Sequence, residues 1–184
     1  MATRGSSLVQ PERVIRGRRV EDDAWTVIGL APHEDLSAAL PAGAVLVPLS
    51  VWLERRDALA ARREPIGVWL KPDDDPAALA PDLGRLSLVA VHFPKFTDGR
   101  GYSTAALLRT RYGYRGELRA FGDVGRDQLF YLARCGFDAF KLAPHRDPEG
   151  ALASFTDFTV RYQGSVDDPV PLFRKRATAG GIAR

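Results

Sequence analysis

The stretch that decides the fold is residues 87–104, SLVAVHFPKFTDGRGYST, in which an apolar run leads into a charged loop. Leu88–Val91 is short, apolar and rich in β-branched residues, which is typical of a strand buried in a parallel sheet. The strand is predicted to end near Pro94, because proline has no backbone N–H to donate to a neighbouring strand. Gly99 and Gly101 then allow the loop to turn sharply or to approach a ligand closely. If the chain has a small-molecule site, we expect it at this loop.

The loop beyond this strand is the first candidate site. Ser103 is a good N-cap residue, and the pattern that follows it predicts a helix over residues 103–112 that closes at Gly113. The N–H groups of the first helical turn would then point toward Arg100 and stabilise an anion there. The expected anion-binding residues are Thr97, Gly99, Arg100, Gly101, Tyr102, Ser103 and Arg126. In the alternative interpretation, Asp98 and Arg100 pair with each other and brace the loop.

Strand and helix patterns alternate from residue 45 onward. Strands are predicted to start near residues 45, 66, 87, 117 and 138, and helices are predicted near residues 52–63, 76–83, 103–112, 126–135 and 148–158. The strands start about 21 to 30 residues apart, which is enough for a helical crossover between parallel strands. The sequence therefore predicts an α/β fold of five consecutive strand–helix units, whose mostly parallel sheet is open or curls like half a barrel. A complete eight-unit barrel is excluded, because it needs about 250 residues.

The two ends of the chain fall outside this alternation. Arg13–Ile15 and Trp25–Ile28 flank a turn near Gly17 and are predicted to pair as a small N-terminal hairpin. We expect a flexible arm at residues 1–12, a single α/β domain with this hairpin at 13–160, and a C-terminal tail at 161–184. The tail is rich in turn residues from position 162 to 176, so no final helix is predicted there. It either wraps the domain or docks a partner.

Polar and charged residues follow every predicted strand at its carboxyl end, where parallel α/β proteins bind their ligands. These residues are Ser50, Lys71, Asp73, Asp74, Asp75, those at 95–102, Asp123, Arg126, His145 and Arg146. Guanidinium and carboxylate groups at one edge suit a polar or anionic ligand. The catalytic candidates are Asp98, Asp123 and His145, and the alternative is a solvated rim of loop charges.

Other residue types exclude whole classes of site. The three histidines, His33, His92 and His145, do not have the spacing of metal ligands, so no metal is predicted, and His92 is interpreted as a packing residue. The single cysteine, Cys135, cannot form an intrachain disulfide, a CxxC pair or the thiolate cage of an iron–sulfur cluster. No flavin or nicotinamide fingerprint is present, so no cofactor is predicted.

The distribution of charge and hydropathy limits the expected partners. The net charge of +3 comes from basic ends that flank a mildly acidic body, whereas a nucleic-acid-binding protein carries its basic face on the folded domain. The sequence contains no run of about 18 apolar residues and no signal-peptide core. We therefore expect a cytoplasmic protein that binds neither nucleic acid nor membrane.

Several motifs, in order along the chain, carry a resemblance to a known family. They are FPKFTDGRGYS (93–103), LLR (107–109), YGYRGELRAFGDV (112–124), DQLFYLARCGFDAF (127–140) and YQGSVDDP (162–169). Over about residues 40–175 the chain resembles an uncharacterised bacterial family of unknown function. This family is labelled as an oxidoreductase involved in sulfite reduction and is encoded beside assimilatory sulfite reductase.

The resemblance implies an accessory protein of assimilatory sulfate or sulfite reduction, working with sulfite reductase or another protein of sulfate assimilation. Oxidoreductase activity is implied by the family label alone. The residues leave a second function open, in which a small α/β enzyme acts on an anionic metabolite at the edge formed by Asp98, Arg100 and Asp123.

Overall fold

The computed structural model describes residues 12–31, 33–159 and 161–179. Within these residues the centre of the molecule is an eight-stranded mixed sheet in the order β2-β1-β8-β7-β6-β5-β4-β3. The six strands β3 to β8 are parallel and lie in chain order, whereas β1 is antiparallel to both β2 and β8. The predicted α/β class is therefore confirmed, and the parallel part of the sheet contains one more strand than the five units predicted.

The elements have the following bounds. The strands are β1 (Arg13–Arg16), β2 (Arg19–Asp22), β3 (Trp25–Val27), β4 (Ala44–Pro48), β5 (Ile66–Leu70), β6 (Leu88–Phe93), β7 (Glu117–Gly122) and β8 (Ala139–Phe140). The α-helices are α1 (Leu49–Ala60), α2 (Arg100–Thr110), α3 (Leu129–Arg134), α4 (Pro148–Ala151) and α5 (Leu172–Ala179). Short 3-10 helices occur at η1 (Pro76–Leu79), η2 (Leu83–Arg85), η3 (Arg126–Gln128) and η4 (Leu152–Thr156).

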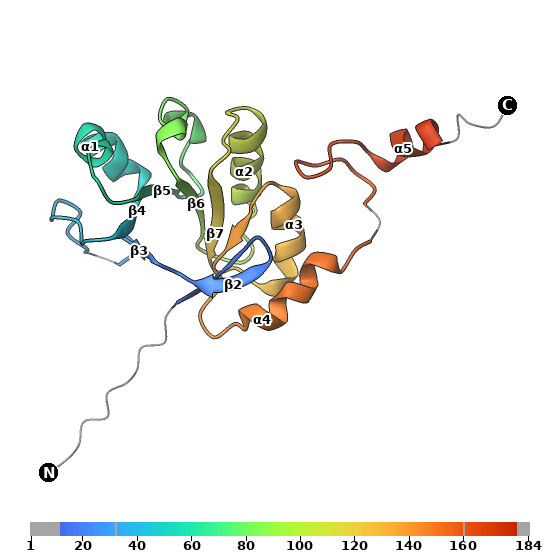
Figure 1. The fold of residues 1–184 in the computed structure, drawn as a ribbon, viewed down its shortest axis with the longest axis horizontal. Helices are drawn as coiled ribbons and strands as arrows, with labels where there is room; N and C mark the ends of the chain where they lie inside the picture. Colours follow the sequence, from blue (N-terminus) through green and yellow to red (C-terminus); the bar gives the residue numbers. More distant parts are fainter. Residues whose placement is uncertain (1–11, 32, 160, 180–184) are drawn as a thin grey trace, which may run out of the picture.

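The central strand β6 shows why the sheet is buried on both faces. Val89, Val91 and Phe93 belong to the larger hydrophobic core, and Leu88 and Ala90 belong to a smaller core on the opposite face. Successive side chains of a strand point to opposite faces, so a continuous apolar run supplies both cores at once. In Figure 1, α1, α2 and α3 lie along the outer face of the curved sheet, next to the larger core.

The smaller core shows that the sheet curls. It contains Leu46, Trp69, Leu88, Ala90 and Phe121, from strands β4 to β7. Side chains of the edge strand β3 pack against the same cluster. In the sheet β3 and β7 are separated by three strands, yet side chains of both line one pocket, so the strands bend toward one another, as in half of a barrel.

A buried ion network fixes the segment between β2 and β3 to this concave face. Arg119 of β7 is 1% exposed and donates to Asp23 at 2.8 Å and to Glu117 at 2.7 Å. The Asp23 side chain is fully buried, and its second oxygen lies 3.3 Å from the Lys141 Nζ atom. Each buried charge thus has an opposite charge beside it, which offsets part of the cost of removing it from water.

The N-terminal hairpin forms with a different partner from the one predicted. β1 pairs with residues 19–22 and not with Trp25–Ile28, because Gly17 (φ +53°) and Arg18 (φ +65°) make a two-residue turn. Positive φ at both central residues is the geometry of a type I′ hairpin turn. Trp25–Val27 instead forms β3, parallel to β4 at the far edge of the sheet.

The helix after β6 begins earlier than predicted. Its N-cap is Gly99 and its first residue is Arg100, so Ser103 lies inside α2 with its side chain exposed and does not cap the helix. The helix ends at Thr110, and Gly113, with φ +67°, turns the chain toward β7. The strands on either side start within one residue of the predicted positions 87 and 117, whereas the helix start was wrong by three residues.

Other predicted helices differ in extent. The predicted helix 52–63 is α1, which starts at Leu49, and the helices predicted at 76–83, 126–135 and 148–158 each contain a 3-10 segment. The tail contains α5, so the prediction of no final helix there was wrong. Residues 1–11 of the predicted arm lie outside the described residues.

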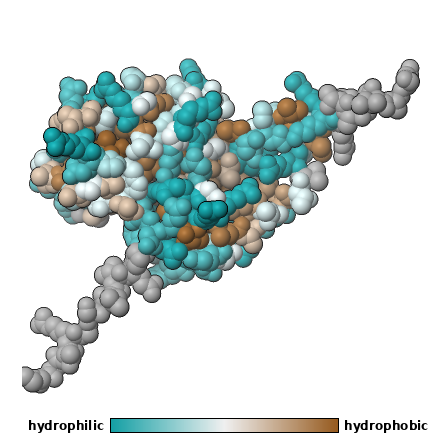
Figure 2. Space-filling view, viewed as in Figure 1, coloured by the Kyte–Doolittle hydropathy of each residue, from teal (hydrophilic) through white to brown (hydrophobic). Residues whose placement is uncertain are grey.

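The tail packs on α3 before α5 begins. Arg134 donates to the Gln163 carbonyl oxygen and to Ser165 Oγ, and Val166 N–H donates to the Arg134 carbonyl oxygen at 3.0 Å. α5 then extends away from the body (Figure 1). Figure 2 shows a largely hydrophilic surface on the visible face, with hydrophobic residues scattered over it. Among the described helices, none has both the length and the apolar composition needed to cross a membrane.

Candidate functional site

The loop after β6, where the sequence places the first candidate site, is held by hydrogen bonds from the next unit. Asp123 Oδ2 accepts a hydrogen bond from Phe96 N–H at 2.9 Å. The Gln128 side chain donates to the Phe96 carbonyl oxygen at 3.2 Å and accepts from Gly125 N–H at 2.9 Å. The catalytic candidate Asp123 therefore has a structural contact, which fixes the loop to the end of β7.

Arg100 is occupied by two carboxylates. Its guanidinium donates to Asp98 at 2.9 and 2.7 Å and also pairs with Asp73. The hydrogen bonds from Arg100 lower the pKa of Asp98 to about 2, and the same pairing raises the pKa of Arg100. The structure thus contains the Asp98–Arg100 pair of the bracing interpretation, and anion binding by this loop stays a prediction.

The other residues of this predicted site are spread around the start of α2. Gly101 is buried so closely that a Cβ atom on it would lie 2.6 Å from Phe93 Cζ, and the Tyr102 ring packs edge-on against Phe93 at 5.7 Å. The remaining members have exposed side chains or backbone: Thr97, Gly99, Ser103 and Arg126. These residues lie at the carboxyl edge of the sheet around the start of α2, and none of them lines the pocket described next.

A pocket of about 990 Å³ lies instead across the concave side of the sheet. Its walls come from β3, from the carboxyl end of β7 and from the segment that follows β8. Ligands of parallel α/β folds bind at the carboxyl ends of the strands, and the curl of the sheet turns this edge into a hollow. The pocket residues are Glu12, Arg13, Asp23, Ala24, Trp25, Thr26, Val27, Leu30, Phe121, Gly122, Lys141, Leu142, Ala143, Pro144, His145, Arg146, Pro148 and Glu149.

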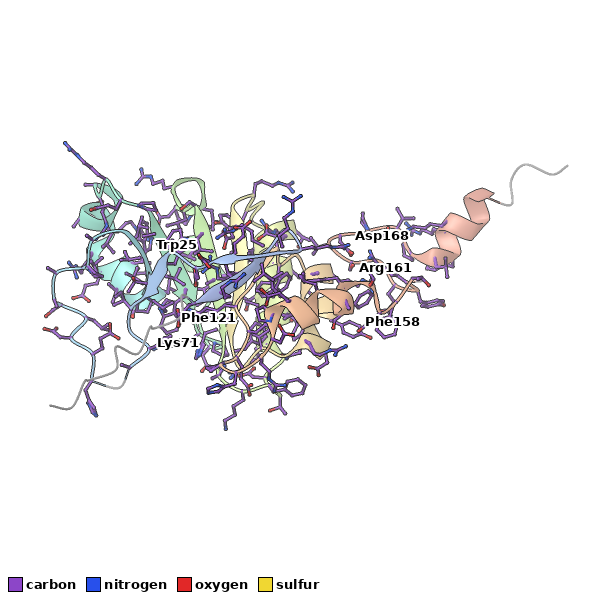
Figure 3. All side chains as sticks on the ribbon, turned by 60° about the horizontal axis from the view of Figure 1, so that its bottom comes forward. Trp25, Lys71, Phe121, Phe158, Arg161 and Asp168 are labelled. Atoms are coloured by element: carbon purple, nitrogen blue, oxygen red, sulfur yellow. The ribbon has the colours of Figure 1, made fainter. Side chains whose placement is uncertain are left out.

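One wall of the pocket is aromatic. Trp25 is half-buried on β3, and Phe121 stands on β7; in Figure 3 their labels lie close together near the middle of the molecule. Phe121 continues into an aromatic cluster, with ring centres 5.9 Å from Trp69 and 5.0 Å from His92. The sequence did not indicate Trp25 as a site residue, because the predicted hairpin removed it from the sheet edge where it lies.

The charged groups of the pocket fall into two sets. Lys141 contacts Glu12 and Asp23, and Arg13 pairs with Glu149 at 3.1 Å, so these cations are already neutralised. Arg146 is exposed, and the ion pairs of the described residues do not include it. Arg146 is therefore the guanidinium of this pocket that has room for an outside anion.

His145, a catalytic candidate from the sequence, lies next to Arg146 on the pocket wall. Arg146 N–H donates to the Ala143 carbonyl oxygen at 3.2 Å, which closes a turn with Pro144 at its second position. His145 occupies the third position with φ +65°, where glycine or asparagine is usual in a type II turn. The turn presents the imidazole and the guanidinium from consecutive positions.

His92 lies beside the pocket. A Cβ atom on Gly122, which lines the pocket, would come within 2.8 Å of the His92 ring. Burial lowers the pKa of His92, and the positive charge of Lys71 lowers it further. The His92 ring also packs against Trp69 and Phe121, with ring centres 5.7 and 5.0 Å away, so it belongs to the aromatic cluster of the concave face.

The described residues contain neither a cluster of metal ligands nor an activated thiol. No group of three or more histidine, cysteine, aspartate or glutamate side chains is arranged there to hold a metal ion. Cys135 is the C-cap of α3, and burial raises its thiol pKa. A neutral thiol is a weak nucleophile.

Comparison with known protein families gives a match that covers the part of the pocket formed by β7 and by the segment after β8. None of the curated proteins compared with the chain matches it. The family model described as "Bacterial protein of unknown function (DUF934)" matches residues 67–173, which include most of β5, all of β6 to β8 and the pocket wall from Phe121 to Glu149. Since the match covers more than half of the sequence, the chain belongs to the DUF934 family of bacterial proteins.

Proposed function

We propose that this protein is an accessory protein of assimilatory sulfite reduction, and that it binds an anionic small molecule in the pocket between β3 and β8. The single observation that carries the binding part is the turn of His145 and Arg146 at the carboxyl edge of a curled parallel sheet. The proposal places the protein in the cytoplasm together with sulfite reductase or another protein of sulfate assimilation.

The site suits an anion for electrostatic reasons. Arg146 carries a planar fork of donors that matches the geometry of a carboxylate, sulfate or phosphate group. His145 adds a second donor from the neighbouring position. The other cations of the pocket are already paired, so an incoming anion would be directed to this turn.

The pathway part of the proposal rests on the sequence motifs and on the family resemblance that they carry. A single cysteine cannot supply the thiolate cage of an iron–sulfur cluster. The proposal therefore gives the electron transfer to the reductase and gives this protein a role in binding or delivery.

Growth of a deletion strain tests the pathway. We expect poor growth on sulfate or sulfite as sole sulfur source, and normal growth on cysteine. A plasmid with the wild-type gene should restore growth, Arg146→Ala should restore it only in part, and Arg63→Ala, which removes an exposed arginine outside the pocket, should restore it fully. Equal growth of the deletion strain on all three sulfur sources would overturn the pathway assignment.

A second candidate function is a small α/β enzyme that acts on an anionic metabolite. It is favoured by the lowered pKa of His92, because a neutral imidazole beside the pocket is able to accept a proton. Under this alternative, His92→Gln would abolish complementation while leaving ligand affinity nearly unchanged. Under the accessory role, complementation would follow affinity.

A further inference from the structure

We propose that the ligand of this pocket is an organic anion with a planar ring, of the nucleotide class, whose ring packs on Trp25 and whose phosphate or sulfate group binds Arg146 and His145. This inference rests on the proposed function, because it uses the same pocket. The ligand that we infer is larger than an inorganic oxyanion and spans the pocket from β3 to the turn after β8.

The size of the pocket favours a ligand larger than an inorganic oxyanion. The pocket has a volume of about 990 Å³, at the upper end of the range of about 300–1,000 Å³ that is usual for drug-sized ligands. An inorganic oxyanion such as sulfite has only a few heavy atoms. Bound at Arg146 alone, it would leave most of this space filled with water.

An apolar wall, formed by β3 and the residues just after it, lies across the pocket from the turn. Trp25 and Val27 of β3 are half-buried, and Leu30 beyond the strand is 45% exposed. An oxyanion has no apolar surface with which to cover them. A planar ring against the indole would remove this surface from water, and aromatic faces accept such rings with little dependence on their identity.

The apolar wall and the cationic turn lie on different sides of the pocket. The indole ring of Trp25 and the exposed Leu30 come from β3 and the residues just after it, whereas the cationic turn follows β8 at the other side of the parallel sheet. A ligand that satisfies both must carry its ring and its anionic group at opposite ends. A nucleoside monophosphate has this arrangement, with a ribose between the base and the phosphate.

Isothermal titration calorimetry on the full chain tests the inference. The probes are adenosine 5′-monophosphate, adenosine, ribose 5-phosphate, sulfite and inorganic phosphate. We expect adenosine 5′-monophosphate to bind about tenfold or more tightly than any of the other four, because only this probe contacts both walls.

Substitutions on the two walls should act on different parts of the ligand. Trp25→Leu should weaken the binding of adenosine 5′-monophosphate about tenfold and leave the affinity for ribose 5-phosphate unchanged. Arg146→Ala should weaken the binding of both phosphates and leave the affinity for adenosine unchanged. Tyr131→Leu removes an exposed aromatic ring on α3, outside the pocket, and should change nothing. Trp25→Tyr keeps a ring and should retain most of the affinity, which separates lost stacking from lost folding.

The outcomes distinguish this inference from the proposed function. If ribose 5-phosphate, phosphate or sulfite binds as tightly as adenosine 5′-monophosphate, and if this binding depends on Arg146, the pocket is an anion site. The inference that its ligand carries a planar ring is then refuted. Binding that is insensitive to both Trp25→Leu and Arg146→Ala would contradict both the inference and the proposed pocket. If none of the five probes binds, both also fail.

Discussion

Arg100 and Arg146 are both exposed arginines at the carboxyl edge of the sheet, but their surroundings differ. Arg100 is held by Asp98 and Asp73, and its fork is filled within the protein. Arg146 has no such carboxylates among the described ion pairs and lines the pocket. The sequence alone could not show which of the two arginines is held by carboxylates of the protein. Both follow a predicted strand, and both lie near glycine, proline or carboxylate residues.

The Asp98–Arg100 pair predicts a pH dependence of stability. Hydrogen bonds from Arg100 lower the pKa of folded Asp98 to about 2, below its usual value of about 3.9, so the pair stabilises the fold above pH 4. Asp98→Asn should therefore melt below the wild type at pH 7, and the difference should shrink as the pH falls from about 4 to about 2. Melting curves over this range, with Asp127→Asn as control, would refute the bracing role if the difference did not depend on pH.

The turn at His145 predicts opposite effects on stability and binding. A non-glycine residue at positive φ costs about 1 kcal/mol, so His145→Gly should leave the free energy of unfolding unchanged or raise it by up to about 1 kcal/mol. Loss of the imidazole should weaken binding of adenosine 5′-monophosphate. Gly113→Ala, which introduces a side chain at φ +67°, is the matched control and should lower stability by about 1 kcal/mol. A clear loss of stability in His145→Gly would show that this side chain serves the fold.

At the level of elements, the starts of strands β6 and β7 were predicted to within one residue. Their apolar runs end at proline or glycine, which are strong local signals. The predicted start of α2 was wrong. Gly99 is the N-cap of the helix, and Ser103 is tolerated inside the helix once Asp123 holds the preceding loop. The side-chain contacts that fix this loop join residues about 30 positions apart, and local patterns carry no information about them.

The end of β7 depends on the absence of a side chain at Gly122. Its φ is +105°, and a Cβ atom would collide with the Phe93 carbonyl oxygen and approach the His92 ring. Gly122→Ala should therefore lower the free energy of unfolding by about 1–3 kcal/mol or more. Gly84→Ala places a methyl group in open space and should be neutral or slightly stabilising, which chemical denaturation of the two variants would measure. Equal stability of the two variants would contradict the close approach of β6 and β7.

At the level of the whole molecule, the curl of the sheet creates the site. β3 and the segment after β8 are the first and last parts of the parallel sheet, and they face one another across the pocket. The sequence predicted that strand ends would carry the site, and it proposed a half-barrel as one of two architectures. It predicted Trp25–Ile28 as a strand but paired it with Arg13–Ile15 and not with β4, and so it could not predict the aromatic wall.

The buried network around Arg119 should hold this curl. Arg119→Met leaves the buried Asp23 carboxylate with Lys141 as its nearest cation and should lower stability by about 3–5 kcal/mol. Adding Asp23→Asn removes the carboxylate charge that has lost its Arg119 partner. The double variant should therefore lose less stability than the sum of the losses in the two single variants. Urea denaturation of the four proteins gives this coupling. Strict additivity would show that the β2–β3 segment is held by other contacts.

The most direct test of the central claim is the response of the three tryptophan indole N–H signals in a ¹⁵N-labelled protein titrated with adenosine 5′-monophosphate. Trp25 lines the pocket, whereas Trp52 donates to Asp82 at 2.9 Å in the larger core, so the two rings report on different places. The account predicts that the Trp25 signal shifts and saturates, that the Trp52 signal stays in place, and that the backbone amides of residues 97–103 move little. A stationary Trp25 signal together with saturating shifts at residues 97–103 would contradict it and return the site to the loop after β6.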